Sequence, residues 1–561
     1  MLTAEMNKPR TLIDDLLAEQ GTLTAVEKFS RAHERRHTTG SRYLALLPAT
    51  APAPGQQYAF EVDLDQCSGC KACVTACHSL NGLDDDETWR SVGRLSSTDW
   101  RTPLQQVVTT ACHHCVDPGC LNGCPVLAYD KDPVTGIVRH LDDQCIGCQY
   151  CVMKCPYEVP QYSKARGIVR KCDMCSSRLA VGEAPACVQA CPNEAIRITL
   201  VDTAKVRGKY RGVKSEDRNP KSERSPKPEA RSWDFGPRIS FGVRSLDFGH
   251  PNSFLPDSPN PAITLPTTRY ISKRALPTDL ESADAREVRR AKAHPPLTLM
   301  LVLSQLGVGL AVMDAATGGA TGGAARMLAV VALAVTALGV VVGTLHLGQP
   351  LKAWRGFLGW RKSWLSRELI AFGAFLAVLG AHVVVRHPLS ALSAALAGLI
   401  AVACSAMVYV DTQRPFWNAA MTFGKFLGTT VLLGGAGALA LAATPSLSRS
   451  LVIAVVMLGV VFKLAVENRI FRFVVDEQDP HLTALNKTAL LLKGPFGLLH
   501  RGRVACALIG GVALPALMLV TDAGAALPAL ALALCVSGEL IERHLFCVVE
   551  VAPKMPGRRS A

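Results

Sequence analysis

Hydrophobic and polar positions divide this 561-residue chain into two halves of different kind. Before Pro296, apolar positions come in short groups between charges, prolines and cysteines, a pattern typical of short strands, turns and loops. From Pro296 onward, long runs of Leu, Ala, Val and Gly predict helices of about twenty residues, the length that crosses the hydrocarbon core of a membrane. Eight such segments are centred near Val302, Val335, Phe375, Ala395, Leu433, Val455, Leu514 and Leu532, and the sixth is shorter and interrupted by Lys463.

The charge between the apolar segments alternates from loop to loop. Basic residues gather before the first segment, in the second, fourth and sixth loops and in the tail, whereas the odd-numbered loops have few. The positive-inside rule then predicts an inner-membrane protein with both termini and the polar half on the cytoplasmic side. The start MLTAEMNKPRTLIDDLLAEQ has no apolar run for a signal peptide, which agrees with this topology. These membrane-flanking charges explain the net charge of +14, so nucleic-acid binding is not expected.

Sixteen of the twenty cysteines form four groups that share the spacing C-x2-C followed by C-x3-C. A tight loop presents three thiolates to one cubane, while the fourth cysteine ligates another cluster, as in bacterial two-cluster ferredoxins. The pattern therefore predicts four 4Fe-4S clusters. The groups are Cys67, Cys70, Cys73 and Cys77; Cys112, Cys115, Cys120 and Cys124; Cys145, Cys148, Cys151 and Cys155; and Cys172, Cys175, Cys187 and Cys191.

Two other uses of these cysteines fit less well. Zinc sites need separate C-x2-C pairs that close a tetrahedron, and a disulfide framework needs a secreted protein. His78 stands where the other three groups have proline, and His113 and His114 lie inside the second group. We expect these histidines to be hydrogen-bonding neighbours rather than ligands, because the thiolate set is already complete.

Residues 59–200 resemble the four-cluster iron-sulfur subunit of the dimethyl sulfoxide reductase family of molybdoenzymes, through ACHHCVDPGCLNGCP and QCIGCQYCVMKCPYEVPQY. Residues 296–561 resemble the membrane anchor subunit of the same family, through LHLGQPLKAWRGFLGWRKSWLSREL, RPFWNAAMTFGKFLG and GELIERHLFCVVEVAPKMPG. The chain thus resembles a fusion of the two subunits. The resemblance implies an α+β ferredoxin-like domain with four clusters, followed by an all-α bundle of eight transmembrane helices.

In that family the first cysteine group shares clusters with the fourth, and the second with the third. The resemblance also implies which cluster lies nearest the membrane, namely the one on Cys124, Cys145, Cys148 and Cys151. The implied ligand sets are Cys67, Cys70, Cys73 with Cys191; Cys172, Cys175, Cys187 with Cys77; Cys112, Cys115, Cys120 with Cys155; and Cys145, Cys148, Cys151 with Cys124.

The anchor resemblance also implies a quinone site at the cytoplasmic ends of the helices. His346 in the HLG phrase and Glu368 in the S-x-x-E phrase fall on the positions that bind quinol in the family, and Arg367 is a weaker candidate. Without the resemblance, each would be read as an interfacial residue satisfied by backbone or headgroups. No haem is expected, because no two histidines face each other inside the bundle. Glu539, Arg543 and His544 are expected to form an ion pair at the cytoplasmic interface.

We therefore expect an electron-transfer and membrane-anchor subunit, which exchanges electrons between a separate molybdopterin-containing catalytic subunit and membrane quinone. The expected chemistry of this chain is quinone redox only, with no substrate catalysis alone. The partner's substrate and the direction of electron flow stay open, since dimethyl sulfoxide reductase-like and sulfite dehydrogenase-like complexes both fit. The alternative, a ferredoxin-driven membrane transporter or ion pump, requires charges inside the helices, where we expect only Lys463 and Glu467. A zinc-rich interaction module on a membrane anchor is a third hypothesis.

The predicted organisation has four parts. Residues 1–58 form an N-terminal extension with amphipathic helices between Arg10 and Arg36, and residues 59–200 form the cluster domain. Residues 201–295 form a basic, Pro-rich linker, whose later part FLPDSPNPAITLPTTRYISKR is expected to lie extended against the cluster domain. Residues 296–561 form the membrane anchor.

Overall fold

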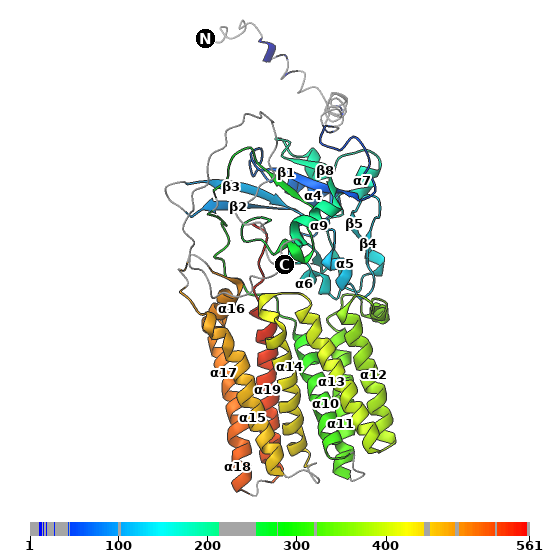
Figure 1. The fold of residues 1–561 in the computed structure, drawn as a ribbon, viewed down its shortest axis with the longest axis vertical. Coiled ribbons are helices and arrows are strands. Elements are labelled where there is room, and N and C mark those ends of the chain that lie inside the picture. Colours follow the sequence, from blue (N-terminus) through cyan, green and yellow to red (C-terminus); the bar gives the residue numbers. More distant parts are fainter. Residues whose placement is uncertain are drawn as a thin grey trace, which may run out of the picture.

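The protein is described by a computed structural model, in which a domain of small sheets stands on one end of a helical bundle (Figure 1). The helices predicted between Arg10 and Arg36 and the Pro-rich residues 212–253 lie almost entirely outside the described residues. The structure describes residues 45–98, 103–211, 254–277, 279–318, 323–442, 449–476, 482–521 and 524–557, with a few single residues besides.

Two three-stranded sheets and two hairpins form the framework of the cluster domain. In the first sheet β1 lies between antiparallel β8 and parallel β9, and in the second β2 lies between β10 and β3. Tyr58 of β1 faces Leu200 of β8 in register. The strands are β1 (Gln56–Asp63), β2 (Ser91–Ser97), β3 (Gln105–Thr110), β4 (Tyr129–Lys131), β5 (Val138–His140), β6 (Gln161–Ser163), β7 (Ile168–Arg170), β8 (Ile196–Asp202), β9 (Arg269–Ile271) and β10 (Leu280–Ser282).

Short helices of the cluster domain begin within or beside the cysteine groups. Their brevity follows from the sequence, because Cys-Pro or Gly ends most of them within two turns. They are α4 (Ala72–Asn81), α5 (Gly119–Gly123), η2 (Asp142–Gln144), α6 (Tyr150–Lys154), α7 (Ser176–Ala180), α8 (Ala186–Gln189) and α9 (Thr203–Arg211).

The described part of the predicted linker joins the cluster domain. After η3 (Pro261–Ile263), strand β9 pairs with β1 and strand β10 pairs with β2. Tyr270 and Leu280 are buried in the same apolar core as Phe60. The stretch predicted to lie against the cluster domain therefore supplies strand β9, and the residues that follow it supply β10.

Seven helices of the described residues are long and apolar enough to cross a membrane. Each of the eight predicted segments coincides with a helical region. The eighth is α19 (Ala526–Val548), which carries Glu539, Glu542 and Arg543 and is not among the seven. The seven spans are α10 (Pro295–Ala316), α11 (Gly323–Thr344), α12 (Trp364–Val384), α13 (Pro388–Val410), α14 (Ala419–Ala440), α15 (Arg449–Asn468) with η6 (Arg469–Phe473), and α17 (Gly497–Leu508) continued through η7 (Ile509–Ala513) and α18 (Leu514–Val520).

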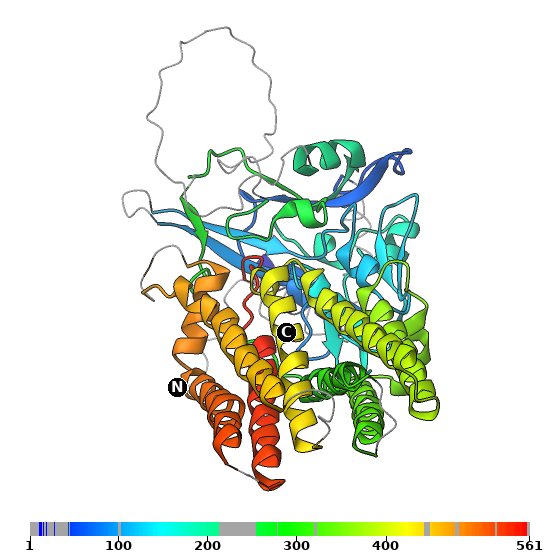
Figure 2. The ribbon, with the colours of Figure 1, turned by 60° about the horizontal axis from the view of Figure 1, so that its bottom comes forward.

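The seventh span contains a π-helical turn with an evident cause. Pro515 has no backbone N–H and its ring crowds the carbonyl one turn earlier, so the α-helical ladder cannot continue through Gly511. Short helices line the end of the bundle that faces the cluster domain: η4 (Pro350–Phe357), η5 (Pro415–Trp417) and α16 (Ala484–Lys493). In the turned view, the helices from 295 to 410 and those from 449 to 548 occupy different sides of the bundle (Figure 2).

The chain returns to the cluster domain after the last helix. Met555 is 1% exposed and belongs to the core that contains Phe60 and Leu95. The backbone at Pro556 runs so close to Gly93 that a Cβ at Gly93 would lie 2.3 Å from the Pro556 carbonyl carbon. The C-terminal tail therefore contributes to the core of the cluster domain.

Candidate metal centres

Residues with left-handed backbone wrap the cysteine groups into loops. In the first group Gly69 and Lys71 have φ of 75° and 63°, and in the third Gly147 and Gln149 have φ of 70° and 59°. Left-handed residues turn the chain sharply, so thiols three positions apart face the same side. Helices α4 and α6 begin directly after Lys71 and Gln149.

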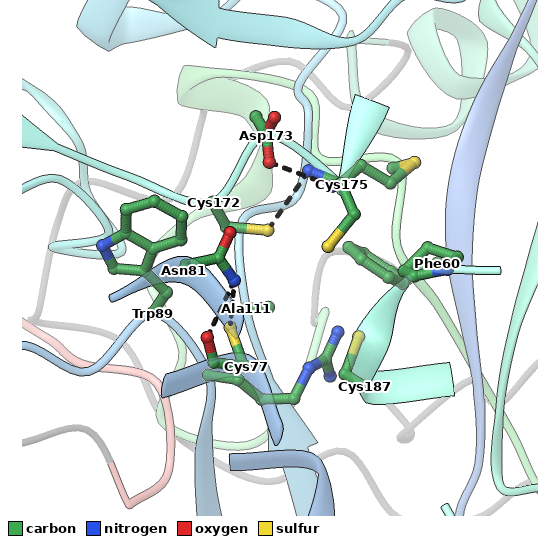
Figure 3. Close-up of a pocket in the computed structure, with 12 residues that line it drawn as sticks. Phe60, Cys77, Asn81, Trp89, Ala111, Cys172, Asp173, Cys175 and Cys187 are labelled. Atoms are coloured by element: carbon green, nitrogen blue, oxygen red, sulfur yellow. Dashed lines mark hydrogen bonds between the residues drawn. The ribbon is translucent and has the colours of Figure 1, made fainter. Parts of the chain in front are cut away.

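The sixteen cysteines line four separate cavities, four to each. Figure 3 shows one of them, in which Cys77 faces Cys172, Cys175 and Cys187 across a single space. We number the cavities by their thiols: cavity I has Cys67, Cys70, Cys73 and Cys191; cavity II has Cys77, Cys172, Cys175 and Cys187; cavity III has Cys112, Cys115, Cys120 and Cys155; cavity IV has Cys124, Cys145, Cys148 and Cys151.

Each cavity combines three cysteines of one group with the last cysteine of another. Helix α4 makes the crossing between the first and fourth groups visible, because it carries Cys73 into cavity I and Cys77 into cavity II. The combinations are those that the family resemblance implies.

The geometry of the cavities suits a multi-iron group better than a single ion. Zinc holds all four sulfurs about 2.3 Å from one point. Among the described residues, no group of three or more His, Cys, Asp or Glu lies close enough together to hold one metal ion. Burial raises the pKa of Cys77 to about 12 and that of Cys175 to about 11, so without a metal both would stay protonated at neutral pH. A cubane with an iron at each of four corners fits four separated thiolates.

Backbone N–H groups point at the thiols from the loops that follow them. Ala128 donates to Cys124 Sγ at 3.2 Å, and Ala195 donates to Cys191 Sγ at 3.3 Å. Such donors favour the thiolate over the thiol. In cavity II the side chain of Asn81 also donates to Cys77 Sγ, at 3.7 Å (Figure 3).

The cavities follow one another from I to IV. The charge of Cys187 in cavity II acts on Cys73 in cavity I, and that of Cys112 in cavity III acts on Cys172 in cavity II. The phenol of Tyr129 is within reach of Cys120 in cavity III and of Cys151 in cavity IV. The four cavities thus form a row.

Cavity IV lies against the membrane half. Gln349 donates its backbone N–H to Ile146 at 3.1 Å, and Ser363 donates its hydroxyl to the Gly123 carbonyl at 2.7 Å. A Cβ at Gly348 would lie 1.9 Å from the carbonyl oxygen of Gly167, so the two backbones touch there. Only glycine permits such an approach at this point.

Two family descriptions match this sequence. The 4Fe-4S dicluster domain matches residues 104–200, and the DMSO reductase anchor subunit matches residues 292–548. The B subunit of the anaerobic dimethyl sulfoxide reductase of Haemophilus influenzae is 35% identical over 164 residues, which are 28% of this chain and 78% of that protein.

The protein belongs to the dimethyl sulfoxide reductase family, as a fusion of the iron-sulfur and anchor subunits. Other relatives match the same part. The B subunit of the Escherichia coli K12 reductase is 36% identical over 154 residues, 26% of this chain and 75% of that protein. The iron-sulfur subunit of the nitrate-inducible formate dehydrogenase of E. coli K12 is 36% identical over 168 residues, 26% of this chain and 57% of that protein. The fusion is therefore an iron-sulfur electron-transfer protein with a multi-pass membrane anchor.

His346 lies in the loop of the fusion that touches cavity IV. It precedes Leu347, which packs against the core around cavity IV, and Gly348, which meets the cluster domain. Its Nδ1 is buried, and burial lowers the pKa of His346 while the carbonyl of Gly343 raises it. The charge of His294, at the start of α10, also lowers this pKa.

Glu368 is buried in the second turn of α12, 5% exposed. The hydroxyl of Ser405 on α13 lies beside its carboxylate. The carboxylate also acts on Tyr150, which stands between two cysteines of cavity IV and donates to the Val408 carbonyl at 3.0 Å. Burial raises the pKa of Tyr150, and the charges of Asp411 and Glu368 add to this effect. Glu368 is therefore within electrostatic range of the loop that carries the cysteines of cavity IV.

The three predicted quinone residues do not form one hydrogen-bonded group. No hydrogen bond or ion pair joins His346 to Glu368 in the part of the chain that the structure describes. Arg367 donates to the carbonyls of Trp360 and Arg361 at 3.0 and 2.9 Å, and its guanidinium lies 4.4 Å from the Trp364 ring centroid. Its contacts hold the loop before α12.

The histidines near the cysteine groups are hydrogen-bonding neighbours, as predicted. His78 Nε2 contacts the Asp84 carbonyl at 3.2 Å, and His113 Nδ1 contacts the Thr268 hydroxyl at 2.9 Å. His114 Nδ1 accepts the N–H of Val138 at 3.1 Å. The latter two tie the second cysteine group to β5 and to the segment before β9.

The expectation that the helices lack buried charge apart from Lys463 and Glu467 is wrong. Lys463 contacts the carboxylates of Glu467, Glu539 and Glu542, and it is fully buried. Arg503 donates to Glu539 at 2.9 Å and to Glu467 at 3.0 Å. We call this set, with Lys425, Glu542 and Arg543, the buried ion network.

The ion pair predicted on the last helix is also different from the one observed. Glu539 pairs with Lys463 and Arg503 from other helices, and Arg543 Nη1 pairs with its neighbour Glu542 at 2.6 Å. Arg543 also donates to Gln305 of α10 at 2.9 Å. Glu539 pairs with cations of other helices rather than with Arg543, because these partners neutralise its charge inside the bundle, away from lipid.

A second buried cluster at the far end of the bundle carries no sequence signal. Asp314 of α10 pairs with Arg386 at 2.7 Å and with His382 Nε2 at 2.6 Å, and all three are nearly or fully buried. In the sequence Asp314 stands alone between apolar residues, so its partners 68 and 72 positions away were not evident.

Proposed function

We propose that this fusion holds four 4Fe-4S clusters, one in each cavity, and conducts electrons between a separate catalytic subunit and membrane quinone. The row of four cysteine cavities that ends at the membrane half carries this proposal. Once bound, the clusters supply one-electron transfer. The chain's own part is to hold them in sequence, exclude water and align the last with the quinone residues.

Cavity IV is the membrane end of the conduit and cavity I is the end for the partner. Contacts between the residues around cavity IV and the membrane half support this role. Ser363 donates to the Gly123 carbonyl, the backbone of Gly348 touches that of Gly167, and Tyr150 donates to the Val408 carbonyl. We propose a molybdopterin-containing catalytic subunit as the partner, by analogy with the reductases to which the related B subunits belong. The fusion alone would then turn over no sulfur or nitrogen substrate.

Quinone would bind between His346 and Glu368, with each residue taking or giving one proton as electrons move. The buried carboxylate of Glu368 supports this role, because the Ser405 hydroxyl lies beside it and it is within electrostatic range of Tyr150, which adjoins Cys151 of cavity IV. Neutral His346 accepts a hydrogen bond at one ring nitrogen and donates at the other. Arg367 would order the loop before Glu368 rather than bind quinone.

The alternating loop charges favour an inner-membrane protein with eight spans, α19 included, and with the cluster domain and both termini in the cytoplasm. The buried ion network supports α19 as the eighth span, because its charges are neutralised inside the bundle. Cysteine accessibility on the cytoplasmic and outer loops in intact cells would test this topology.

The deciding experiment reduces the purified protein anaerobically with a menaquinol analogue and follows the clusters by electron paramagnetic resonance. We expect four clusters, reduced by the quinol in wild type and only by dithionite in Glu368→Gln. Arg386→Gln, at the opposite end of the bundle, is the matched control and should keep quinol reduction. Quinol reduction that survives in both Glu368→Gln and His346→Asn would refute the quinone site.

A second candidate function, a ferredoxin-driven ion pump, is favoured by the buried ion network. Lys425, Lys463, Arg503 and Arg543 face Glu467, Glu539 and Glu542 inside the bundle, four cations against three carboxylates. Proteoliposomes with an internal pH dye and dithionite-reduced clusters, but no quinone, would decide between the two. Proton movement that occurs in wild type and stops in Lys463→Met would support the pump. Absence of proton movement in wild type would support the quinone conduit.

A further inference from the structure

Two cations are buried in the cluster domain without a carboxylate partner. Arg90 is 2% exposed and lies beside cavity II, and Lys171 is 2% exposed and lies beside cavity III. Among the described residues, no carboxylate is within ion-pair distance of either side chain. A buried cation with no anion is strongly unfavourable, so its counter-charge must come from something else in the cavity.

The surroundings of Arg90 point to cavities I and II as the source of that charge. Its guanidinium lies within electrostatic range of Cys73 of cavity I and of Cys77, Cys172 and Cys187 of cavity II. Nη1 donates to the Thr109 hydroxyl at 3.3 Å, and that hydroxyl lies 3.7 Å from Cys73 Sγ. Nη2 is buried and has no hydrogen-bond partner among the residues that the structure describes.

An aromatic ring also holds the guanidinium of Arg90 in place. The guanidinium stacks over the ring of Phe60, 4.6 Å from its centroid. Phe60 itself lines cavity II (Figure 3). The cation therefore cannot swing out to water, and it faces whatever occupies the cavity.

Lys171 repeats the arrangement one step further along the row. Its ammonium donates to the carbonyls of Val138 and Cys172. It lies within electrostatic range of Cys112 and Cys120 of cavity III, of Cys172 of cavity II and of the carboxylate of Asp173, which is beyond ion-pair distance. One buried cation thus stands between cavities I and II, and another between II and III.

We propose that Arg90 and Lys171 are the counter-ions of the bound clusters, and that each raises the reduction potentials of the two clusters it lies between. This inference rests on the proposed function, since it requires the cavities to hold 4Fe-4S clusters. A cubane bound by four thiolates is a net anion and gains one further negative charge on reduction. A fixed cation stabilises the reduced form more than the oxidised form. Electron transfer forms and breaks no bond here. Arg90 and Lys171 act on the clusters only through the electrostatic field of their charges.

The test is a redox titration of the purified full-length protein, followed by electron paramagnetic resonance. In Arg90→Gln we expect at least a tenfold lower ratio of reduced to oxidised cluster in cavity II at a fixed potential, which is about 59 mV for one electron. The cluster in cavity I should shift in the same direction, and that in cavity IV should not shift. Arg94→Gln, at an exposed position on strand β2, which begins directly after Arg90, should leave every potential unchanged.

Arg90→Lys separates charge from structure. If Arg90→Gln loses its clusters, Arg90→Lys must restore all four with near-wild-type potentials, and failure to do so would overturn the proposal. Unchanged potentials in Arg90→Gln with four clusters intact would overturn it too. Lys171→Gln gives an independent result, a shift confined to cavities II and III. Absence of cluster signals in the wild type would instead refute the proposed function itself.

Discussion

Helix α4 provides a sharp test of how the thiols are divided. Cys73 and Cys77 are four residues apart on this helix, about 6 Å along its axis at 1.5 Å per residue. They nevertheless line different cavities. Cys77 and Cys187 are 110 positions apart in the sequence and line the same cavity. Replacing Cys73 and replacing Cys77 should therefore damage different clusters, whereas replacing Cys77 and replacing Cys187 should damage the same cluster.

The expected iron content of each variant follows from the number of clusters that it loses. Four cubanes contain about sixteen irons, and losing one ligand should remove one cluster and leave about twelve. The double variant Cys73→Ala with Cys77→Ala should leave about eight irons, because two cavities are damaged. The double variant Cys77→Ala with Cys187→Ala should leave about twelve, because the second change damages a cavity that has already lost its cluster.

Iron and acid-labile sulfide per purified protein are the quantities to measure, with spectroscopy to identify the missing cluster. Cys404→Ala in α13, far from the cavities in sequence, is the control and should keep all the iron. Equal iron in the two double variants would refute the crossed arrangement. So would loss of the same cluster in both single variants Cys73→Ala and Cys77→Ala.

Four further outcomes are expected. Glu368→Gln should slow quinol oxidation by about a hundredfold or more, the usual contribution of a proton-transferring side chain, while dithionite still reduces the clusters. Since burial lowers the pKa of His346, its folded-state pKa lies below the unfolded value of about 6.5, so its contribution to stability is present above that pH and is lost as the pH falls. His346→Asn should therefore lose less thermal stability than wild type between pH 7.5 and 5, and an equal loss would contradict the reasoning. Lys463→Met removes a buried cation that contacts three carboxylates and should destabilise the detergent-solubilised protein by about 3 to 5 kcal/mol, whereas Lys463→Met with Glu539→Leu should cost less, as measured by thermal unfolding. Gly348→Val should push the Gly167 carbonyl away and uncouple quinol from the clusters, whereas Gly380→Val, where a Cβ meets open space, should not.

Most of the prediction of the cysteine sites and of the helices rests on patterns within short stretches of the sequence. The cysteine spacing is a local signal, and the left-handed residues within each loop, such as Gly69 and Gly147, bring the thiols together without help from distant parts. The apolar runs are equally local, and each of the predicted segments is helical. Both signals could be read because the residues that interact are close in sequence.

Contacts between distant residues could not be read in this way. Lys463, Arg503 and Glu539 lie on three helices, and each alone looks like a charge near a membrane interface. Strands β9 and β10 come from a stretch that looks like a linker, because prolines break its pattern and only pairing with β1 and β2 makes it a sheet. Arg90 looks like an ordinary surface arginine until its burial beside cavity II is known.

The return of the chain after α19 sets an order on biogenesis. Met555 completes a core built largely by residues 46–280, and the Gly557 N–H bonds to Asp284 at 3.2 Å. The ribosome makes Met555 only after every helix of the bundle has been synthesised. The core of the cluster domain therefore closes last, when the final helix has been threaded and the tail has come back to the same side. A chain that stalls or inserts with the wrong topology would leave this core without Met555. The apolar surface that stays exposed is of the kind that quality-control proteases recognise.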